Sequence, residues 1–200
     1  MRRIIALPIA AILIFGTLTP GFSQRRGRID VHPKLDTTSF IEDGRRLSLI
    51  VGTRAAIQRL DRDFIPLEIA VVNRGFAGLT LTPESFALVD ADGRRYPAVS
   101  GGTLKKAYGN IDVDRRLSVL SSILRARHAF YTPVDGPLTA SFDRPFVRDI
   151  KLHRFSFATE IVYFPRPTGD VAGQQLRLIM KTRELDEPVV VSFLIASRKS

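Results

Sequence analysis

The stretch that decides the fold spans residues 67–99 and runs LEIAVVNRGFAGLTLTPESFALVDADGRRYPAV. Short runs in which apolar residues alternate are separated by turn-forming residues, and a period of two predicts strands with one buried face. The alternating positions are Ile65, Leu67, Ile69 and Val71 in a run that begins just before the stretch, then Leu79 and Leu81, then Phe86 and Leu88. Residues 73–75 (Asn-Arg-Gly) and 90–93 (Asp-Ala-Asp-Gly) are typical of turns, and the second predicts a hairpin with a return strand at Tyr96 and Ala98.

Further apolar runs flank this stretch on both sides. Residues 47–51 alternate before Gly52 stops the run, and residues 160–164, 176–180 and 189–195 provide three later runs. An Asp-Glu-Pro loop lies between the last two and is expected to join them as a hairpin. Seven or more short strands separated by turns predict an all-β fold, an antiparallel β-sandwich.

One segment departs from this alternation. From Asp112 onward the apolar positions are Val113, Leu117, Leu120 and Leu124, and their spacing places them on one face of a helix. We expect Asp112 to be the N-cap, Asp114 to lie in the first turn, and Arg125, Arg127 and His128 to lie in the last turn. The sequence therefore predicts a helical insertion around residues 103–128. Residues 129–156 are rich in Pro and Gly, so we expect mostly loop with one short strand near 138–142.

The order of these features resembles the immunoglobulin-like domains of unknown function found on exported bacterial proteins, including small mycobacterial secreted antigens. The resemblance rests on the Asn-x-Gly turn after residue 72, the Ser-Phe-x-Leu-x-Asp strand at 85–90, the following Asp-Gly turn and Tyr96. It implies an immunoglobulin-like sandwich in an envelope or secreted setting, and it brings no catalytic residues. This chain differs from the family in its long insertion at 103–156 and in Glu160, where the family often has glycine.

The N-terminus predicts export. Arg2 and Arg3 precede an apolar stretch at 4–18, and small residues stand at Gly21 and Ser23, which is the pattern of a signal peptide at 1–23. An uncleaved anchor is the alternative. Residues 24–45 are expected to form a linker with a basic arm, followed by the β-domain at 46–200. With no second hydrophobic segment, we expect a mature chain without a transmembrane segment, in the periplasm or secreted.

The amino-acid composition limits which catalytic, metal-binding and disulfide chemistry the chain can support. The chain has 200 residues, of which 44% are hydrophobic and 25% charged, which suits one globular domain. It has no Cys, so disulfides, a lipoprotein cysteine, thiolate-bound zinc and thiol catalysis are excluded. The histidines are His32, His128 and His153, with no metal-ligand spacing among them. No Gly-x-Ser-x-Gly elbow exists, and the carboxylate pairs at 42–43, 61–63 and 184–187 suit solvated turns. We therefore assign no catalytic residue, metal or cofactor.

The charge is strongly positive. Thirty Lys and Arg against twenty Asp and Glu give a formal net charge of +10. The residues we predict to bind a partner are Arg94, Arg95, Lys105, Lys106, Arg115, Arg116 and Arg127. Arg116 and Arg127 are eleven positions apart, so one helix could carry both on a single stripe. A positive face of this kind fits an acidic partner, although ordinary solvation of a helix would produce it too. Nucleic acid is not the expected partner, because recognition would normally add exposed aromatic residues or a known fold.

These features favour an exported, non-enzymatic envelope module that presents a surface to a protein partner or to an anionic envelope component. The alternative is a secreted hydrolase with a site between the insertion and a sheet edge. A third hypothesis is a subunit that pairs through an edge strand, for which residues 189–195 are the candidate.

Overall fold

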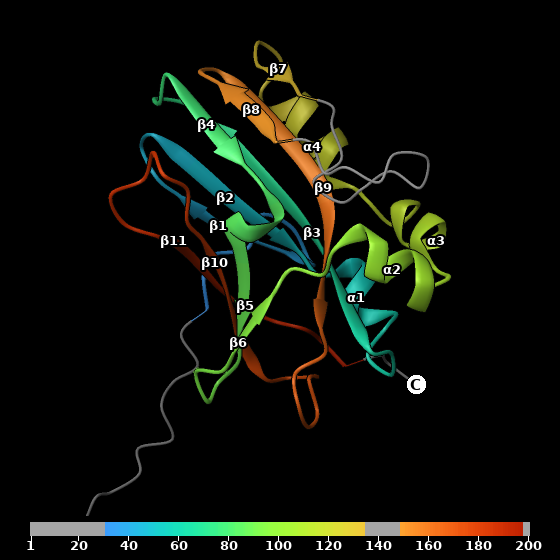
Figure 1. Ribbon diagram of the computed structural model, residues 1–200. Helices are drawn as coiled ribbons and strands as arrows, with labels where there is room; N and C mark the ends of the chain where they lie inside the picture. The colour runs from blue at the N-terminus through green and yellow to red at the C-terminus, as the bar shows by residue number, and fades with distance from the viewer. Residues whose placement is uncertain (1–30, 135–148, 198–200) are drawn as a thin grey trace, which may run out of the picture.

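The computed structural model describes residues 31–134 and 149–197 (Figure 1). The predicted signal peptide at 1–23, residues 24–30 of the predicted arm and the expected strand near 138–142 lie outside the described residues. The strands are β1 (Ser39–Asp43), β2 (Leu47–Gly52), β3 (Phe64–Asn73), β4 (Gly78–Leu81), β5 (Phe86–Val89), β6 (Arg95–Pro97), β7 (Thr132–Pro133), β8 (Ile150–His153), β9 (Ser156–Pro165), β10 (Gln175–Met180) and β11 (Val189–Leu194). The helices are α1 (Arg54–Ile57), a 3-10 turn (Pro83–Ser85), α2 (Gly101–Ala107), α3 (Ile111–Arg115) and α4 (Leu120–Arg127).

The strands pair into three sheets. A five-stranded sheet has the order β1-β2-β3-β9-β7, a four-stranded sheet has the order β11-β10-β5-β6, and β4 pairs with β8. Neighbours are antiparallel except β7, which runs parallel to β9. The chain is therefore β-rich, with mixed and antiparallel sheets and few helices, as the alternating runs predicted.

The two larger sheets share one hydrophobic core. From β3 it takes the alternating residues Ile65, Leu67, Ile69 and Val71. From the four-stranded sheet it takes Phe86, Leu88, Leu176, Leu178, Met180, Val191 and Phe193. Burying an aliphatic or Phe side chain of this size stabilises a fold by roughly 1.5–3 kcal/mol. These alternating positions therefore fix which face of each strand points inward, and with it the register of the sheets.

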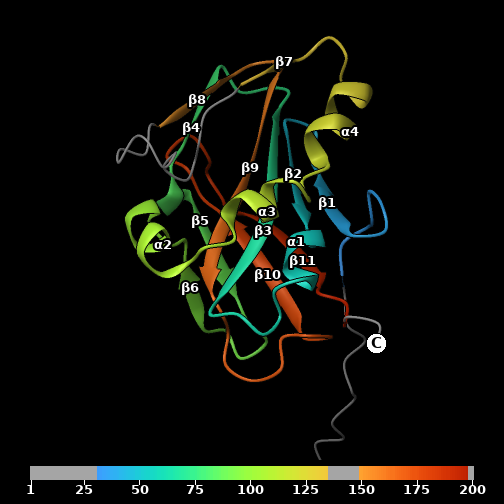
Figure 2. The ribbon, with the colours of Figure 1, turned by 90° about the vertical axis from the view of Figure 1, so that its right-hand side faces the viewer.

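The second face of the five-stranded sheet is also covered, by the insertion. Figure 2 shows α3 in front of β3, with α2 to its left and α4 to its upper right. Leu120 and Leu124 of α4 are buried in one outer cluster with Ile50, Ala70, Val72 and Phe157. Leu104, Tyr108 and Ile111 of α2 and α3 are buried in another, with Val99, Ile161 and Tyr163. The insertion thus packs on the sheet, and β3 is buried on both faces.

The prediction of one continuous helical face from Asp112 is wrong. Three short helices occupy the insertion, and residues 116–119 separate α3 from α4. Asn110, and not Asp112, occupies the N-cap position of α3, while Val113 is 47% exposed. The break allows α3 and α4 to bury apolar residues against two different patches of the sheet, which one straight helix could not do. Among the described residues, no helix is long and apolar enough to cross a membrane.

Two further boundaries differ from the prediction. β1 lies inside the segment predicted as a linker at 24–45, and it pairs with β2 from Ser39↔Gly52 to Asp43↔Ser48. Only Phe40 is a buried hydrophobic residue in this strand, so the alternation that marks a strand is too short to detect. β8 and the start of β9 lie inside the segment assigned to the insertion at 103–156.

The predicted hairpins are confirmed. β10 and β11 pair from Met180↔Val189 onward, across the Asp-Glu-Pro loop. β5 and β6 pair across the Asp-Gly turn, where Gly93 takes a φ of 83° that a side chain would disfavour. Asp90 is buried and completes this turn, because its carboxylate accepts hydrogen bonds from the Arg94 N–H at 2.8 Å and the Tyr96 hydroxyl at 2.9 Å.

β11 lies at the edge of the four-stranded sheet, as the edge-pairing hypothesis requires. The middle of that edge is already occupied by the chain itself. The His32 N–H donates to the Ser192 carbonyl, and the Ser192 N–H donates to His32 Nδ1, both at 2.9 Å. A partner strand would have to displace His32 in order to extend this sheet.

Candidate functional site

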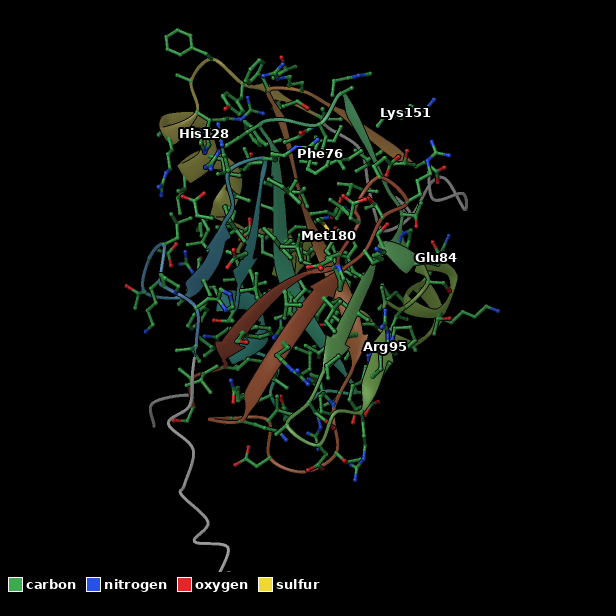
Figure 3. All side chains as sticks on the ribbon, turned by 90° about the vertical axis from the view of Figure 1, so that its left-hand side faces the viewer. Phe76, Glu84, Arg95, His128, Lys151 and Met180 are labelled. Atoms are coloured by element: carbon green, nitrogen blue, oxygen red, sulfur yellow. The ribbon has the colours of Figure 1, made fainter. Side chains whose placement is uncertain are left out.

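The predicted partner-binding residues do not form one patch. Arg94 and Arg95 lie on the β5–β6 hairpin, and Lys105 and Lys106 lie in the last turn of α2. Arg115 ends α3 with Arg116 directly after it, and Arg127 ends α4. All of them are exposed. Figure 3 shows Arg95 and His128, the neighbour of Arg127, toward opposite ends of the molecule. The expected stripe shared by Arg116 and Arg127 does not form, because residues 116–119 separate α3 from α4.

Some of these charges are engaged locally. Arg94 lies 3.6 Å from the Asp92 carboxylate and donates to the Thr168 hydroxyl at 2.6 Å. Arg115 lies 3.9 Å from Asp112. These exposed pairs contribute little to stability, but they reduce the net positive charge at the hairpin and at α3.

A different basic group gathers where four chain connections meet at one end of the sheets. The connections are residues 44–46, 74–77, 128–131 and 154–155. The strand pairing brings them together, because Leu47 pairs with Asn73, Asn73 pairs with Ser156, and Ser156 pairs with Thr132. We call this region the basic–aromatic end, and its members are Arg46, Arg74, Phe76, Arg127, His128, Phe130, Tyr131, Arg154 and Phe155.

The rings of the basic–aromatic end contact one another and the arginines. The ring of Tyr131 has centroid distances of 4.8 Å to His128 and 5.7 Å to Phe155. The Arg154 guanidinium lies 4.7 Å from the centre of the Phe155 ring, and that of Arg46 lies 3.9 Å from the centre of Phe76. Cation–π contacts of this kind hold a guanidinium beside an apolar surface while leaving it open to an anion.

Two phenylalanines at this end face water. Phe130 is 99% exposed and Phe155 is 48% exposed. Phe155 also has a φ of 57°, in the left-handed region that bulky residues rarely adopt. Its backbone is held there because its N–H donates to the Asn73 carbonyl at 2.8 Å and its carbonyl accepts from the Thr132 N–H at 3.0 Å. A non-glycine residue in this region costs of order 1–3 kcal/mol, and such strain clusters at functional sites.

Asn73 organises two of the four connections. Its side chain is completely buried, and its amide nitrogen donates to the carbonyls of Leu152 at 2.9 Å and Phe76 at 3.0 Å. Its amide oxygen accepts from the Phe76 N–H at 2.9 Å. One buried amide thus ties the turn at 74–77 to β8, so this end is preformed.

The electrostatics leave positive charge available. Asp43 lies 2.7 Å from Arg74, and its pKa lies below the usual range because the Ser48 hydroxyl donates to it and Arg74 is close, while partial burial acts in the opposite direction. Partial burial and the charges of Arg74 and Arg127 lower the pKa of His128, which favours its neutral form. The guanidinium groups therefore dominate the charge of this end.

The insertion that carries Arg127 and His128 is fixed by two buried carboxylates. Glu68 on β3 accepts from the N–H groups of Val119 at 3.0 Å and Leu120 at 2.8 Å, and from the Ser118 hydroxyl. These N–H groups belong to the first turn of α4, which has no side-chain cap of its own. Glu68 therefore replaces the missing cap and holds α4 against the sheet.

Asp114 performs the corresponding task for α3. It is fully buried and accepts from the Tyr108 hydroxyl at 2.6 Å, Arg59 Nε at 2.8 Å and the Tyr163 hydroxyl at 3.3 Å. Burial raises the pKa of both tyrosines, and Asp114 raises them further. The network is satisfied within the protein and is enclosed, which suits a structural role.

Two hollows on the described part of the chain are lined mainly by polar residues. One of about 490 Å³ is lined by Thr80, Thr82, Glu84, Ser85, Asp149, Lys181, Thr182 and Arg183. Its Lys181 ammonium already donates to the backbone carbonyls of Leu185 and Asp186. Another of about 370 Å³ lies between the start of α4 and the segment before β1, where the hydrolase hypothesis places a site. Its carboxylate, Asp36, accepts from the Thr38 N–H and the Ser39 hydroxyl, and its other described lining residues are Thr37, Thr38, Arg54, Val119 and Ile123.

Sequence reasoning found Arg127 and missed the rest of the basic–aromatic end. The missed signal is that Phe130 and Phe155 stand outside every alternating run and next to His, Tyr or Arg. The sequence could not predict that the four connections meet, because their meeting depends on the pairing of β9 with both β3 and β7. No group of three or more Asp, Glu or His within the described residues could hold a metal ion.

Comparison with known proteins gives weak likenesses. No family model and no curated protein matches the chain. The ycdA protein of Bacillus subtilis, called a "putative lipoprotein", has a TM-score of 0.41 at 10% identity over 77% of this chain, and the chain spans only 38% of that protein. The yjhA protein of Bacillus subtilis has a TM-score of 0.36 at 10% identity, with 74% of this chain and 79% of that one covered. A functionally unknown protein from Listeria monocytogenes has a TM-score of 0.40 at 14% identity, with 79% and 83% covered. TM-scores this low assign the chain to no fold family.

Proposed function

We propose that this chain is an exported, non-enzymatic module of the cell envelope that binds an anionic envelope component through its basic–aromatic end. The observation that carries the proposal is the meeting of Arg46, Arg127 and Arg154 with exposed phenylalanines on four connections of one scaffold. Loops presented by a rigid sheet are a usual location for binding surfaces. The signal-like N-terminus supports an envelope or secreted location.

We propose further that the two larger sheets form the immunoglobulin-like sandwich expected from the sequence. The shared core and the β5–β6 and β10–β11 hairpins support it. The departure is the insertion, which covers the outer face of the five-stranded sheet and carries Arg127 to the basic–aromatic end.

This end suits a ligand that presents phosphate or carboxylate groups. Arginine presents a planar fork that binds phosphate or carboxylate groups, and four arginines outnumber the single carboxylate named there, Asp43, which Arg74 already engages. Among the described residues of this end we assign no pair of nucleophile and general base, so we propose binding and not hydrolysis.

A pair of matched charge reversals tests the proposal. The probe is polyphosphate, a soluble polyanion, and its affinity for the chain purified after export is measured by calorimetry at low and high salt. Arg127→Glu with Arg154→Glu should weaken binding by at least about tenfold, since each basic residue near an anionic surface contributes about 1 kcal/mol. Added salt should weaken binding too.

The matched control is Arg94→Glu with Arg95→Glu, which makes the same change of charge on the hairpin at the far end. We expect this pair to retain the affinity of the unmodified chain within about twofold. Equal losses from both pairs would mean that overall charge, and not the basic–aromatic end, drives binding. Absence of binding by a folded chain would contradict the proposal.

A further inference from the structure

We infer that the basic–aromatic end docks on an anionic phospholipid bilayer, with Phe130 inserted below the headgroups, Phe155 at the interface and the arginines on lipid phosphates. This inference deepens the proposed function and rests on it, because it names the anionic component. Three observations support it: the exposure of the phenylalanines, their placement beside arginines, and the rigidity of the connections that present them.

The exposed ring of Phe130 would be stabilised by contact with an apolar partner. At 99% exposed, its side chain has essentially no packing against the described residues, and in the sequence it lies between an exposed Ala129 and Tyr131. A soluble polyanion would leave this ring in water. A bilayer has an apolar interior directly beneath a layer of phosphates. It can therefore bury the Phe130 ring while its phosphates bind the neighbouring arginines.

The placement fits the interface of a membrane. Phe155 stacks under the Arg154 guanidinium, and the ring of Tyr131 links Phe155 to His128 at the end of α4. Aromatic rings at headgroup depth, with long cationic side chains reaching toward phosphates, are the usual composition of this zone. The positive charge complements the negative potential of a leaflet that contains anionic lipids.

The fold places the aromatic rings and the arginines at the same end of the molecule. The strand pairing brings 128–131, 154–155 and 74–77 to the same end, and Figure 1 shows β7, β8 and the start of β4 reaching that end beside α4. Figure 3 places His128 and Phe76 toward it. Asn73 and the backbone bonds of Phe155 fix these connections before any ligand arrives, so little ordering is needed on docking.

Fluorescence provides the sharpest test, because the chain contains no tryptophan. Phe130→Trp introduces a single reporter at a position whose side chain is 99% exposed among the described residues, so folding should be unaffected. With vesicles of phosphatidylglycerol in phosphatidylcholine, its emission should shift to the blue and be quenched by lipids brominated along their acyl chains. Vesicles of phosphatidylcholine alone should produce neither change.

The matched control is Arg95→Trp, an exposed position on the hairpin at the far end. Its emission should stay unchanged with the same vesicles. A second variant, Phe130→Ser, should weaken vesicle binding roughly tenfold, because it removes the inserted apolar surface.

The outcomes separate this inference from the proposed function. Polyphosphate binding that depends on Arg127 and Arg154, without vesicle binding, would overturn the bilayer and leave the proposed function standing. Vesicle binding that Phe130→Ser does not weaken, or bound Phe130→Trp that brominated lipids do not quench, would overturn insertion at this end. Equal binding to phosphatidylcholine alone would overturn the role assigned to the arginines. Failure with both probes would overturn the inference and the proposed function together.

Discussion

The carboxylate of Glu68 accepts the hydrogen bond of the Leu120 backbone N–H at 2.8 Å, across 52 positions of the chain. A strand thereby caps a helix of the insertion, and the cap determines where α4 begins. Since α4 ends at Arg127 and leads directly into 128–131, this contact anchors the helix that precedes the exposed Phe130.

Glu68→Gln should destabilise the fold by about 1–2 kcal/mol, because an amide is a weaker acceptor for the N–H groups it caps and loses the charge that favours a helix N-terminus. The measurement is urea unfolding followed by circular dichroism, with hydrogen exchange at Val119 and Leu120. Glu84→Gln, an exposed control, should change stability by less than about 0.5 kcal/mol. Equal stability of the two variants would show that the cap contributes nothing.

Asp114→Asn should lower the free energy of unfolding by about 3 kcal/mol. The change leaves the Arg59 guanidinium, which is only 14% exposed, without its buried counter-charge. The control is Asp112→Asn on the same helix, whose exposed pair with Arg115 should be worth less than about 0.5 kcal/mol. Tyr108→Phe should have an intermediate cost of about 1 kcal/mol for one hydrogen bond. If Asp114→Asn were no worse than Asp112→Asn, α3 would not depend on the buried network.

Phe155→Gly should stabilise the fold, by about 0.5–1 kcal/mol, because glycine adopts the left-handed φ of 57° without strain. The same change should weaken vesicle binding, since the ring lies beside Arg154 at the proposed interface. Thermal unfolding and vesicle co-sedimentation measure the two effects. A loss of stability would show that the contact with Tyr131 outweighs the backbone strain.

The pKa of His128 is lowered by partial burial and by the charges of Arg74 and Arg127, with Asp43 opposing them. The folded state therefore binds fewer protons here than the unfolded state, so the stability from neutral His128 is present above about pH 6.5 and lost as the pH falls toward the folded pKa. His128→Gln should reduce this loss, as measured by urea unfolding at about pH 8 and about pH 5. Identical pH dependence in both chains would exclude His128 as its source.

Most strands could be predicted from the sequence, because a half-buried strand leaves an alternating pattern that needs no knowledge of its partners. This holds for Leu79 with Leu81, and for Phe86 with Leu88, each of which is buried as expected. β1 could not be predicted from the sequence, because Phe40 is its only buried hydrophobic residue. The break between α3 and α4 could not be predicted either, because Glu68, which binds the residues at the break, lies far away in the sequence.

The candidate site was less predictable. Charge alone selected seven basic residues, and the structure distributes them over the hairpin, α2, α3 and the end of α4. Arg127 belongs to the basic–aromatic end, while Arg74 and Arg154 were not selected because each stands alone in a turn. Which turns meet depends on the pairing of β3 with β9, and no local pattern records it.

The most direct test of binding by the basic–aromatic end is an amide NMR map of the isotopically labelled chain titrated with polyphosphate. If this end binds the polyanion, the largest shift changes cluster at Arg74, residues 127–131, Arg154 and Phe155, and Arg94, Arg95 and α2 change little. Changes centred on the hairpin or on α2, with the basic–aromatic end unmoved, would contradict it.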